Sequence, residues 1–302
     1  MKDQANKLRE MAEALRNQIE AELSKKLQQT RVIVVSSGKG GVGKSTVALN
    51  TALDLCALGK RVVLMDADLG MANIDIMLGI IPQYNIYDMI TEQKTIKDIM
   101  VDGPNGLKII PGGSGMIELA NIKDNEMKKI LVEMGRLDGE FDYLIVDTGA
   151  GIANNVLSFL LAADDIIVVT TPEPTSLTDA YGIVKNAKKS GFEGNLFLVV
   201  NRVAKESEGV AVAQKFKLVS EKFLNLDIKT LGYILQDSQV EQGIRRQEAL
   251  VQAFPRSPAA RNLMNIARKL IDHQEMQYKD LQTKNGGIKT FFKKIIGYSQ
   301  AE

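Results

Sequence analysis

Cysteine and histidine are almost absent from this chain, which has one residue of each, Cys56 and His273. A single cysteine cannot form an internal disulfide or a Cys-Cys metal pair, so we expect Cys56 to be a small buried residue on a helix. The same scarcity argues against an iron–sulfur carrier, because two subunits would supply only two thiolates and such a cluster normally needs four. His273 falls in an expected long helix and gives no sign of catalysis.

Long apolar stretches and an excess of charge of either sign are also lacking. The chain has no run of about 18 apolar residues, and its N-terminus lacks the apolar core of a secretory signal. We therefore expect a cytoplasmic protein that does not span a membrane. The formal net charge is +1 over 302 residues, which gives no strong sign of nucleic-acid binding. A hydrophobic content of 45% is enough for a full core.

Short apolar runs alternate with stretches that have helical spacing. The runs are rich in β-branched residues and do not alternate with polar residues, which is typical of strands buried on both faces; they lie at 32–35, 62–65, 143–146, 166–169 and 196–200, with weaker ones at 107–110 and 231–235. Helices are expected near 44–58, 126–136, 154–162, 176–189, 209–223 and 257–283. This order predicts an α/β fold, a mostly parallel doubly wound sheet covered by helices on both sides.

A glycine-rich phosphate-binding motif follows the first expected strand. It reads Gly38-Lys39-Gly40-Gly41-Val42-Gly43-Lys44-Ser45-Thr46 and runs into an apolar helix, as the pattern G-x-x-x-x-G-K-[ST] requires. Glycines allow successive backbone N–H groups to converge on phosphate oxygens at a helix N-terminus. In this motif Lys44 would bridge the β- and γ-phosphates, and Ser45 would hold Mg²⁺. The sequence therefore predicts a nucleotide hydrolase that uses ATP or ADP and Mg²⁺.

The extra lysine, Lys39, is not needed to cradle phosphate. The form K-G-G-x-G-K-[ST] resembles the deviant P-loop of the MinD/ParA-type ATPases, in which this lysine reaches the nucleotide of a partner subunit. The resemblance covers about residues 31–255 and implies a homodimer that forms with ATP.

Three aspartates fit the same family. Asp66 and Asp68 follow the second strand, and Asp147 ends another one and begins a D-x-x-A-G stretch that closes at Gly151. Ligands of α/β proteins bind at this carboxyl edge of the sheet. The resemblance implies that Asp68 positions the attacking water, that Asp66 helps to organise the Mg²⁺ shell, and that Asp147 binds Mg²⁺ through water. A helix cap or a turn is the alternative role for Asp66 and Asp68.

Base recognition rests on positions where this family contacts adenine. Asn201 and Arg202 follow one strand and Asp237 follows another. The chain has no N-K-x-D quartet, so ATP is favoured over GTP. Capping of a helix is the alternative role for Asn201.

The C-terminal segment has the pattern of an interfacial helix. Residues 288–298 place Ile288, Phe291, Phe292, Ile295 and Ile296 at offsets of 0, 3, 4, 7 and 8, with lysines at the remaining charged positions. Residues 284–287 (Lys-Asn-Gly-Gly) predict a flexible break before it. We expect this helix to bind an anionic membrane in the ATP state, on the inner face of the cell membrane. The alternative is a helix that packs on its own domain.

The N-terminal segment, residues 1–30, carries an amphipathic stripe ahead of the first strand: Leu8, Met11, Ala12, Leu15, Ile19, Leu23 and Leu27. It begins Asp3-Gln4-Ala5-Asn6-Lys7-Leu8-Arg9. Together with the P-loop and the C-terminal helix, this stretch resembles the FlhG family, MinD-like ATPases that regulate the number and placement of bacterial flagella. In that family Asp3, Gln4, Ala5, Leu8 and Arg9 would engage the FlhF-type GTPase, and the glutamine would complete the partner's catalytic site.

These segments define the expected organisation, with the ATPase domain at 31–283 between the two terminal helices. Two related readings stay open at this point. A MinD-type division-site regulator would begin almost at the first strand, and the N-terminal extension counts against it. A ParA-type DNA-segregation ATPase would bind duplex DNA, for which the near-neutral charge gives no support. No motif marks the substrate pocket of a metabolic amide-ligase-like enzyme.

Overall fold

The computed structural model describes residues 29–68, 73–92, 94–112, 124–278 and 286–299. The N-terminal amphipathic helix and its partner-binding residues Asp3 to Arg9 lie outside this part of the chain, as do the first two residues of the expected break at 284–287.

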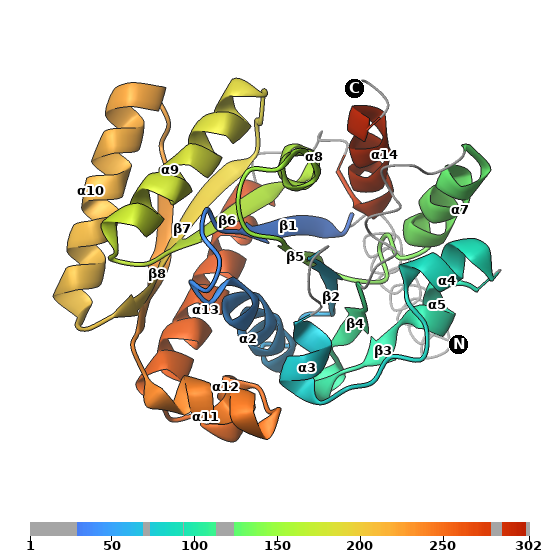
Figure 1. Ribbon diagram of the computed structural model, residues 1–302, viewed down its shortest axis with the longest axis horizontal. Helices are drawn as coiled ribbons and strands as arrows, with labels where there is room; N and C mark the ends of the chain where they lie inside the picture. Colours follow the sequence, from blue (N-terminus) through green and yellow to red (C-terminus); the bar gives the residue numbers. More distant parts are fainter. Residues whose placement is uncertain (1–28, 69–72, 93, 113–123, 279–285, 300–302) are drawn as a thin grey trace, which may run out of the picture.

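A single sheet forms the centre of the described chain (Figure 1). Its strands follow the order β3-β4-β2-β5-β1-β6-β7-β8, and every neighbouring pair is parallel except β3 with β4. The bounds are β1 (Arg31–Ser36), β2 (Val62–Ala67), β3 (Val101–Asp102), β4 (Lys108–Ile110), β5 (Tyr143–Thr148), β6 (Asp165–Thr170), β7 (Asn195–Val203) and β8 (Lys229–Leu235). The predicted α/β fold with a mostly parallel sheet is confirmed.

Helices cover both faces of this sheet, and the core is accordingly divided in two. One apolar cluster holds side chains of α4 (Ile86–Thr91), α5 (Ile96–Ile99), α7 (Asp124–Gly135), α8 (Asn154–Ala162), α9 (Pro174–Lys189), α10 (Glu206–Leu224) and α14 (Ile288–Ser299). The other holds α2 (Lys44–Ala57), α3 (Ile74–Leu78), α12 (Leu250–Ala253) and α13 (Pro258–Tyr278), with α11 (Ser238–Arg246) against it. Alternate residues of β1, such as Val34 and Ile33, face the two clusters. This division explains why the strands lack polar alternation.

Short elements account for most of the structure that periodicity does not predict. The helices α3, α4, α5 and α12, the 3-10 turn η1 (Pro104–Gly106) and the two-residue strand β3 are all shorter than two helical turns or one typical strand. Two of these helices, α4 and α5, are stabilised at their N-termini. The N-cap residues Asn85 and Thr95 each form a capping box with an aspartate three positions later. Capping satisfies the orphan N–H groups of the first turn, so it can stabilise a helix too short to show a period.

The C-terminal helix forms where it is expected, but its apolar face is inside the protein. Ile288, Phe291, Phe292 and Ile295 are between 0% and 6% exposed, and Ile296 is half-buried. Helix α14 packs on α7 and α8 (Figure 1), and the ring centroids of Phe159 and Phe291 are 6.0 Å apart. The packing of a helix on its own domain, the alternative left open by the sequence, is the arrangement observed.

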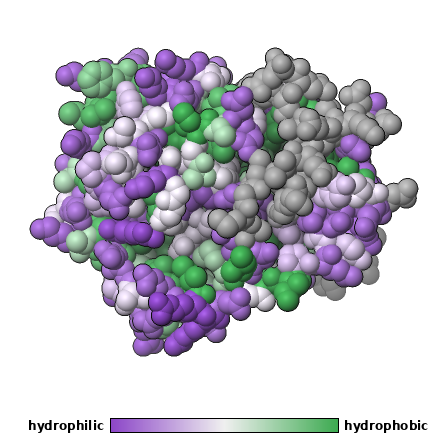
Figure 2. Space-filling view, in the orientation of Figure 1, coloured by the Kyte–Doolittle hydropathy of each residue, from purple (hydrophilic) through white to green (hydrophobic). Residues whose placement is uncertain are grey.

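The basic positions of α14 remain on the surface. Lys289, Lys293 and Lys294 are exposed while the apolar side chains beside them are buried. Most of the face seen in Figure 2 is likewise hydrophilic, with hydrophobic residues in small groups. No helix among the described residues is long and apolar enough to cross a membrane. Contact of the apolar face of α14 with a lipid surface would therefore require the helix to leave α7 and α8.

Candidate functional site: a phosphate-binding loop at the carboxyl edge of the sheet

The glycine-rich loop joins β1 to α2 and ends at the N-terminus of that helix. Gly41 and Gly43 have left-handed backbone angles, φ of 77° and 91°, which residues with a side chain rarely adopt. Gly43 is the N-cap of α2, and no described side chain caps the helix there. The first N–H groups of α2 are therefore left for a ligand, and an anion is the ligand that a helix N-terminus favours.

The glycines of the loop fall into two groups by their surroundings. A Cβ at Gly38 would lie 2.2 Å from the backbone carbon of Asp179 in α9, and one at Gly43 would lie 2.4 Å from Nδ2 of Asn201. A Cβ at Gly40 or Gly41 would meet no atom within 4 Å. The first pair is thus required by packing, whereas the second pair borders open space. This open side fits a loop that receives phosphate oxygens.

Lys44 is buried in the site and paired with a strand-end carboxylate. Its Nζ lies 2.6 Å from Oδ1 of Asp147 on β5, and the two side chains are 7% and 0% exposed. Burial raises the pKa of Asp147, while the neighbouring Lys44 ammonium acts to lower it. The other oxygen, Oδ2, has no hydrogen-bond partner among the described residues. An orphaned buried carboxylate oxygen beside the P-loop fits the predicted role of Asp147 at a Mg²⁺ site.

Asp66 at the end of β2 holds the loop that follows it. Its carboxylate accepts backbone N–H groups from Asp68 (3.1 Å), Asn73 (2.9 Å) and Ile74 (3.2 Å). Burial, and after it the charge of Asp147, raises the pKa of Asp66 to about 6, although these hydrogen bonds oppose the shift. Asp66 therefore acts as the turn-forming residue that was its alternative role, and its part in a Mg²⁺ shell stays a prediction.

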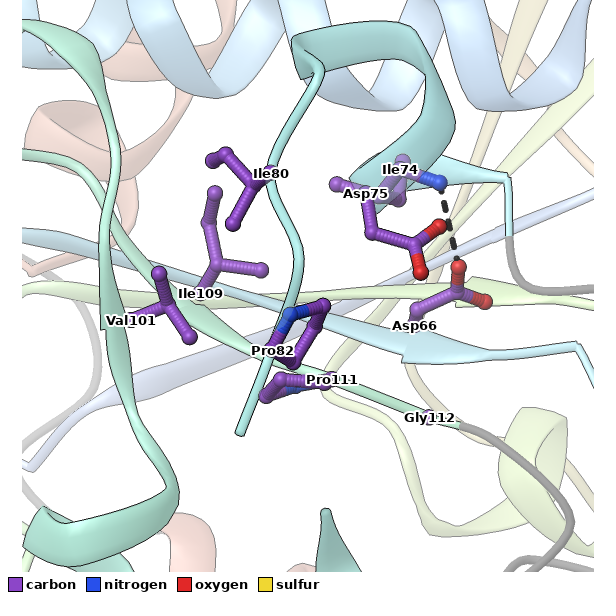
Figure 3. A pocket seen from close by; sticks show the side chains of 9 residues that line it. All are labelled: Asp66, Ile74, Asp75, Ile80, Pro82, Val101, Ile109, Pro111 and Gly112. Atoms are coloured by element: carbon purple, nitrogen blue, oxygen red, sulfur yellow. Dashed lines mark hydrogen bonds between the residues drawn. The ribbon is translucent and has the colours of Figure 1, made fainter. Parts of the chain in front are cut away.

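A small hollow lies next to Asp66 (Figure 3). Its walls are mostly apolar and come from α3, β3, β4 and the segments beside them: Ile74, Ile80, Pro82, Val101, Ile109, Pro111 and Gly112. Asp66 and Asp75 lie at one end of it, and Val101 and Ile109 at the other. Neither lysine of the P-loop lines this hollow. We therefore assign the phosphate site to the open side of the loop and not to this hollow.

Asn201 and Asp237 are occupied by the protein itself. Nδ2 of Asn201 donates to the carbonyl of Val42 (2.8 Å), and its Oδ1 accepts from the N–H of Arg202 (2.9 Å). The carboxylate of Asp237 caps α11 through Gln239 N (2.9 Å) and accepts from Ala259 N at the start of α13 (3.3 Å). Asn201 thus clamps the P-loop and Asp237 joins two helices. Contact of either side chain, or of the exposed Arg202, with adenine stays a prediction.

The loop after Asp147 is tied to the P-loop strand. The N–H of Gly151 donates to the carbonyl of Ser37 (2.8 Å), and the hydroxyl of Thr148 donates to the carbonyl of Val35 (3.2 Å). Gly151 has φ of 97°, so glycine is needed at this turn. The loop ends at α8, only three residues further on. A change at the phosphate site can therefore reach α8 through this short connection.

Lys39 is separated from these groups. Its Nζ lies 2.9 Å from Oε2 of Glu173, the residue before α9, and 3.3 Å from Oγ1 of Thr175 in the first turn of α9. Both partners of the ion pair are exposed, whereas Lys44 and Asp147 are buried. Sequence reasoning did not identify Glu173, because one exposed acidic residue after a strand carries no pattern.

Mg²⁺ fits this donor set without a dedicated cage. Among the described residues there is no cluster of three or more His, Cys, Asp or Glu that could hold a metal ion on its own. A nucleotide-bound Mg²⁺ takes one or two protein oxygens and completes its shell with phosphates and waters. The hydroxyl of Ser45, which interacts with Asp147, and the free oxygen of Asp147 are suitable donors.

Comparison with known proteins agrees with this geometry. The family model described as ParA, NUBPL iron-transfer P-loop NTPase, matches residues 28–271. The antiactivator FleN of Pseudomonas aeruginosa is 35% identical over 244 residues, which are 81% of this chain and 87% of FleN. The flagellum site-determining protein YlxH of Helicobacter pylori is 34% identical over 270 residues, 89% of this chain and 90% of YlxH.

Solved structures show the same fold. The septum site-determining protein MinD from Pyrococcus horikoshii, complexed with Mg-ADP, is 25% identical and superposes with a TM-score of 0.66 over 82% of this chain and 98% of that chain. Motifs in order, a matching sheet and similarity over most of the chain agree with one another. The chain belongs to the MinD/ParA family of P-loop ATPases, in the branch that includes the flagellar FlhG proteins.

Proposed function

We propose that this protein is a Mg²⁺-dependent ATPase that dimerises with ATP, binds the membrane in that state and regulates the number or placement of flagella. The observation that carries the proposal is the separation of the two P-loop lysines. Lys44 is buried and paired with Asp147, and a bound phosphate would replace the carboxylate as its partner or bind the ammonium beside it. Lys39 lies on the surface, where its partners are exposed. A lysine of the phosphate loop whose partners are exposed can exchange them for the nucleotide of a second subunit.

Within the site, the residues divide the work of hydrolysis. The backbone N–H groups at the start of α2 hold phosphate oxygens, and Lys44 neutralises charge that develops on them. Ser45 and Asp147 would hold Mg²⁺, which neutralises further charge on the phosphates. Asp68, half-buried beyond the end of β2, positions the attacking water. Because such positioning matters more in the transition state than in the ground state, its loss lowers turnover more than binding.

Membrane association uses α14 in a released form. Its four buried apolar side chains could each gain about 1.5–3 kcal/mol on full burial in lipid, but the same burial is already provided by α7 and α8. The free energies nearly cancel, so a single helix has little net affinity. Dimerisation supplies two helices on one body, and avidity can then rise by about 10²–10⁴. The loop from Asp147 to α8 offers a route by which ATP could also loosen α14.

The partner GTPase would be engaged by the N-terminal segment, residues 1–30. The support is the match of Asp3 to Arg9 to the FlhG pattern and the likeness of the chain to YlxH, which is named a flagellum site-determining protein. A MinD-type role in division is the second candidate, supported by MinD of Helicobacter pylori at 29% identity over 278 residues. The flagellum site-determining protein YlxH is more similar to this chain, at 34% identity.

Three measurements test this proposal. In sedimentation velocity, the wild type and Asp68→Ala should both dimerise with Mg-ATP, and the wild type should not dimerise with ADP. In an ATPase assay, Asp68→Ala should hydrolyse ATP about tenfold more slowly than the wild type or slower still. In a GTPase assay, a peptide of residues 1–30 should accelerate an FlhF-type GTPase. Gln4→Ala should abolish most of that acceleration, whereas the matched control Gln18→Ala should keep it. Wild-type turnover by Asp68→Ala, or full acceleration by the Gln4→Ala peptide, would remove the corresponding role.

A further inference from the structure

Helix α14 packs on α7 and α8, with the ring of Phe291 against that of Phe159. We call the buried apolar side chains of these two helices and the residue after α7 the α7–α8 face: Ile130, Met134, Leu137, Val156, Phe159 and Leu160. These side chains belong to the same buried cluster as Ile288, Phe291, Phe292 and Ile295 of α14. If α14 leaves for a membrane, as the proposed function requires, the part of this face that α14 covers is exposed. An exposed apolar face of this kind needs another occupant.

The chain's own N-terminal extension enters the described structure at the edge of this face. The N–H of Gly286, just before α14, donates to Oε1 of Gln29 (2.9 Å), which is the first described residue. The neighbouring Thr30 is fully buried: its hydroxyl donates to the carbonyl of Phe141 (2.8 Å) and accepts from the N–H of Gly139 (3.1 Å). The first described residue of the chain thus lies beside the start of α14.

The same loop, residues 137–141, also fixes the start of α14. The carboxylate of Asp138 accepts from the N–H groups of Ile288 (2.5 Å) and Lys289 (3.0 Å), which are orphan donors of the first helical turn. The loop therefore holds both terminal segments within one small region. A helix that begins at this loop, whether α14 or one formed by the N-terminal extension, would start beside the α7–α8 face.

The spacing of apolar residues in the extension matches the length of that face. Counting back from Gln29, apolar residues recur at Leu27, Leu23, Ile19 and Leu15. A helix rises about 1.5 Å per residue, so Leu27 to Ile19 spans about 12 Å, as does Ile288 to Ile296. Leu27 is two residues from Gln29, just as Ile288 is two residues from Gly286. A helix that runs back from Gln29 would bring its apolar side chains to the same levels.

We propose that residues 15–28 are the second occupant of the α7–α8 face and that they bind it as a helix when α14 is released. The relative strength of the two occupants sets the order. Helix α14 inserts two phenylalanines and two isoleucines, whereas the extension offers only leucine and isoleucine, which bury less area. Helix α14 is therefore the stronger occupant, and the extension would cover the face only after α14 departs. Because the two segments compete for one face, release of α14 to a membrane would be coupled to docking of the N-terminal segment that carries the partner-binding residues.

Hydrogen exchange on the full-length protein, without vesicles or a partner, tests this directly. Phe291→Glu/Phe292→Glu makes α14 unfit for the buried face. In this variant amides of 289–299 should exchange faster than in the wild type, while amides of 15–28 should become at least tenfold more protected and those of α7 and α8 should stay within a few-fold. Adding Ile19→Glu/Leu23→Glu should remove the protection of 15–28 and raise exchange in α7 and α8; the control Arg16→Glu/Glu20→Lys should do neither.

Binding of a fluorescent ATP analogue identifies variants that remain folded, and Phe292→Ala is a milder replacement if the double glutamate fails this check. The proposal is overturned if residues 15–28 exchange at the rate of free chain in a folded variant whose α14 is unprotected. It is also overturned if they are equally protected in the wild type, or if the face is instead covered by dimerisation, seen as a doubled mass. Because no membrane is present, a failure here is distinct from a failure of membrane binding.

Discussion

The ammonium of Lys39 lies 2.9 Å from the carboxylate of Glu173 within the same chain, with the two side chains 44% and 63% exposed. This proximity lowers the pKa of Glu173. An exposed pair of this kind contributes little to stability and is screened by salt. Lys39 is therefore held near its own subunit by an interaction that is easily exchanged for a phosphate in another.

The substitution Lys39→Ala should leave stability almost unchanged and abolish dimerisation with ATP. The unfolding free energy should change little, because only the exposed ion pair is lost. A matched control is Lys97→Ala, which breaks another exposed pair, with Glu140 at 3.2 Å, away from the P-loop. Urea denaturation and sedimentation velocity check the two effects. Normal ATP-dependent dimerisation by Lys39→Ala would contradict the assignment of this lysine to a partner subunit.

The buried pair behaves in the opposite way. Lys44→Ala should destabilise the nucleotide-free protein by about 3–5 kcal/mol, because it leaves Asp147 buried and unpaired. Combining it with Asp147→Asn should recover most of that stability but not nucleotide binding. Urea denaturation and titration with a fluorescent ATP analogue measure the two quantities. A Lys44→Ala protein as stable as the wild type would show that Asp147 gains nothing from the lysine.

The buried carboxyl of Asp54 on α2 should make the stability of the fold depend on pH, whether or not nucleotide is present. This carboxyl is 3% exposed, and its Oδ2 has no hydrogen-bond partner among the described residues. Burial raises its pKa from 3.8 to about 7, against an opposing effect of Arg268. Between these values the folded state holds a proton that the unfolded state releases, so stability falls as pH rises, and the full penalty is present above about pH 7.

Asp54→Asn removes this penalty. The variant should be more stable than the wild type at pH 8, by at most about 4 kcal/mol, since one pKa unit corresponds to about 1.4 kcal/mol. Its advantage should shrink towards pH 5 and vanish below about pH 4. Asp272→Asn, at an exposed position on α13, serves as a control and should show no such trend. A difference between wild type and Asp54→Asn that does not change with pH would refute the buried-carboxyl explanation.

The substitution Asn201→Ala tests whether this side chain holds the P-loop at Val42 or contacts the adenine base. Because both polar atoms of its side chain are bonded to the protein, Asn201→Ala should release the P-loop at Val42 and weaken ATP and GTP binding by the same factor. Isothermal titration with both nucleotides measures that ratio. A loss confined to ATP would instead establish the adenine contact that the sequence suggested.

The sequence predicts the sheet and the P-loop well because both produce strong local patterns. Strands such as β1 and β5 are buried on both faces and stand out as apolar runs. The loop at Gly38 to Thr46 matches the residue pattern of a phosphate-binding loop. The structural uses of Asn201, Asp237 and Gly38 could not be predicted in this way. Each depends on a contact with a segment far along the chain, such as Asn201 with Val42 or Gly38 with Asp179.

Helix α14 shows the same limit in another form. Its amphipathic pattern predicts an apolar face that must be buried, but a lipid surface and the α7–α8 face satisfy that requirement equally well. Only the structure shows Phe291 against Phe159, and Asp138 capping Ile288. The pattern of one segment thus predicts burial without specifying the partner.

The most direct test of the account is co-sedimentation with anionic liposomes in ATP and in ADP. Wild-type protein should bind in ATP and remain largely in solution in ADP, because one docked helix has little net affinity and two released helices act together. Lys39→Ala and Phe291→Glu/Phe292→Glu should both fail to bind in ATP, and wild-type binding should weaken at high salt as the effect of Lys289, Lys293 and Lys294 is screened. Equal wild-type binding in ATP and ADP would contradict the nucleotide switch on which the proposed function rests.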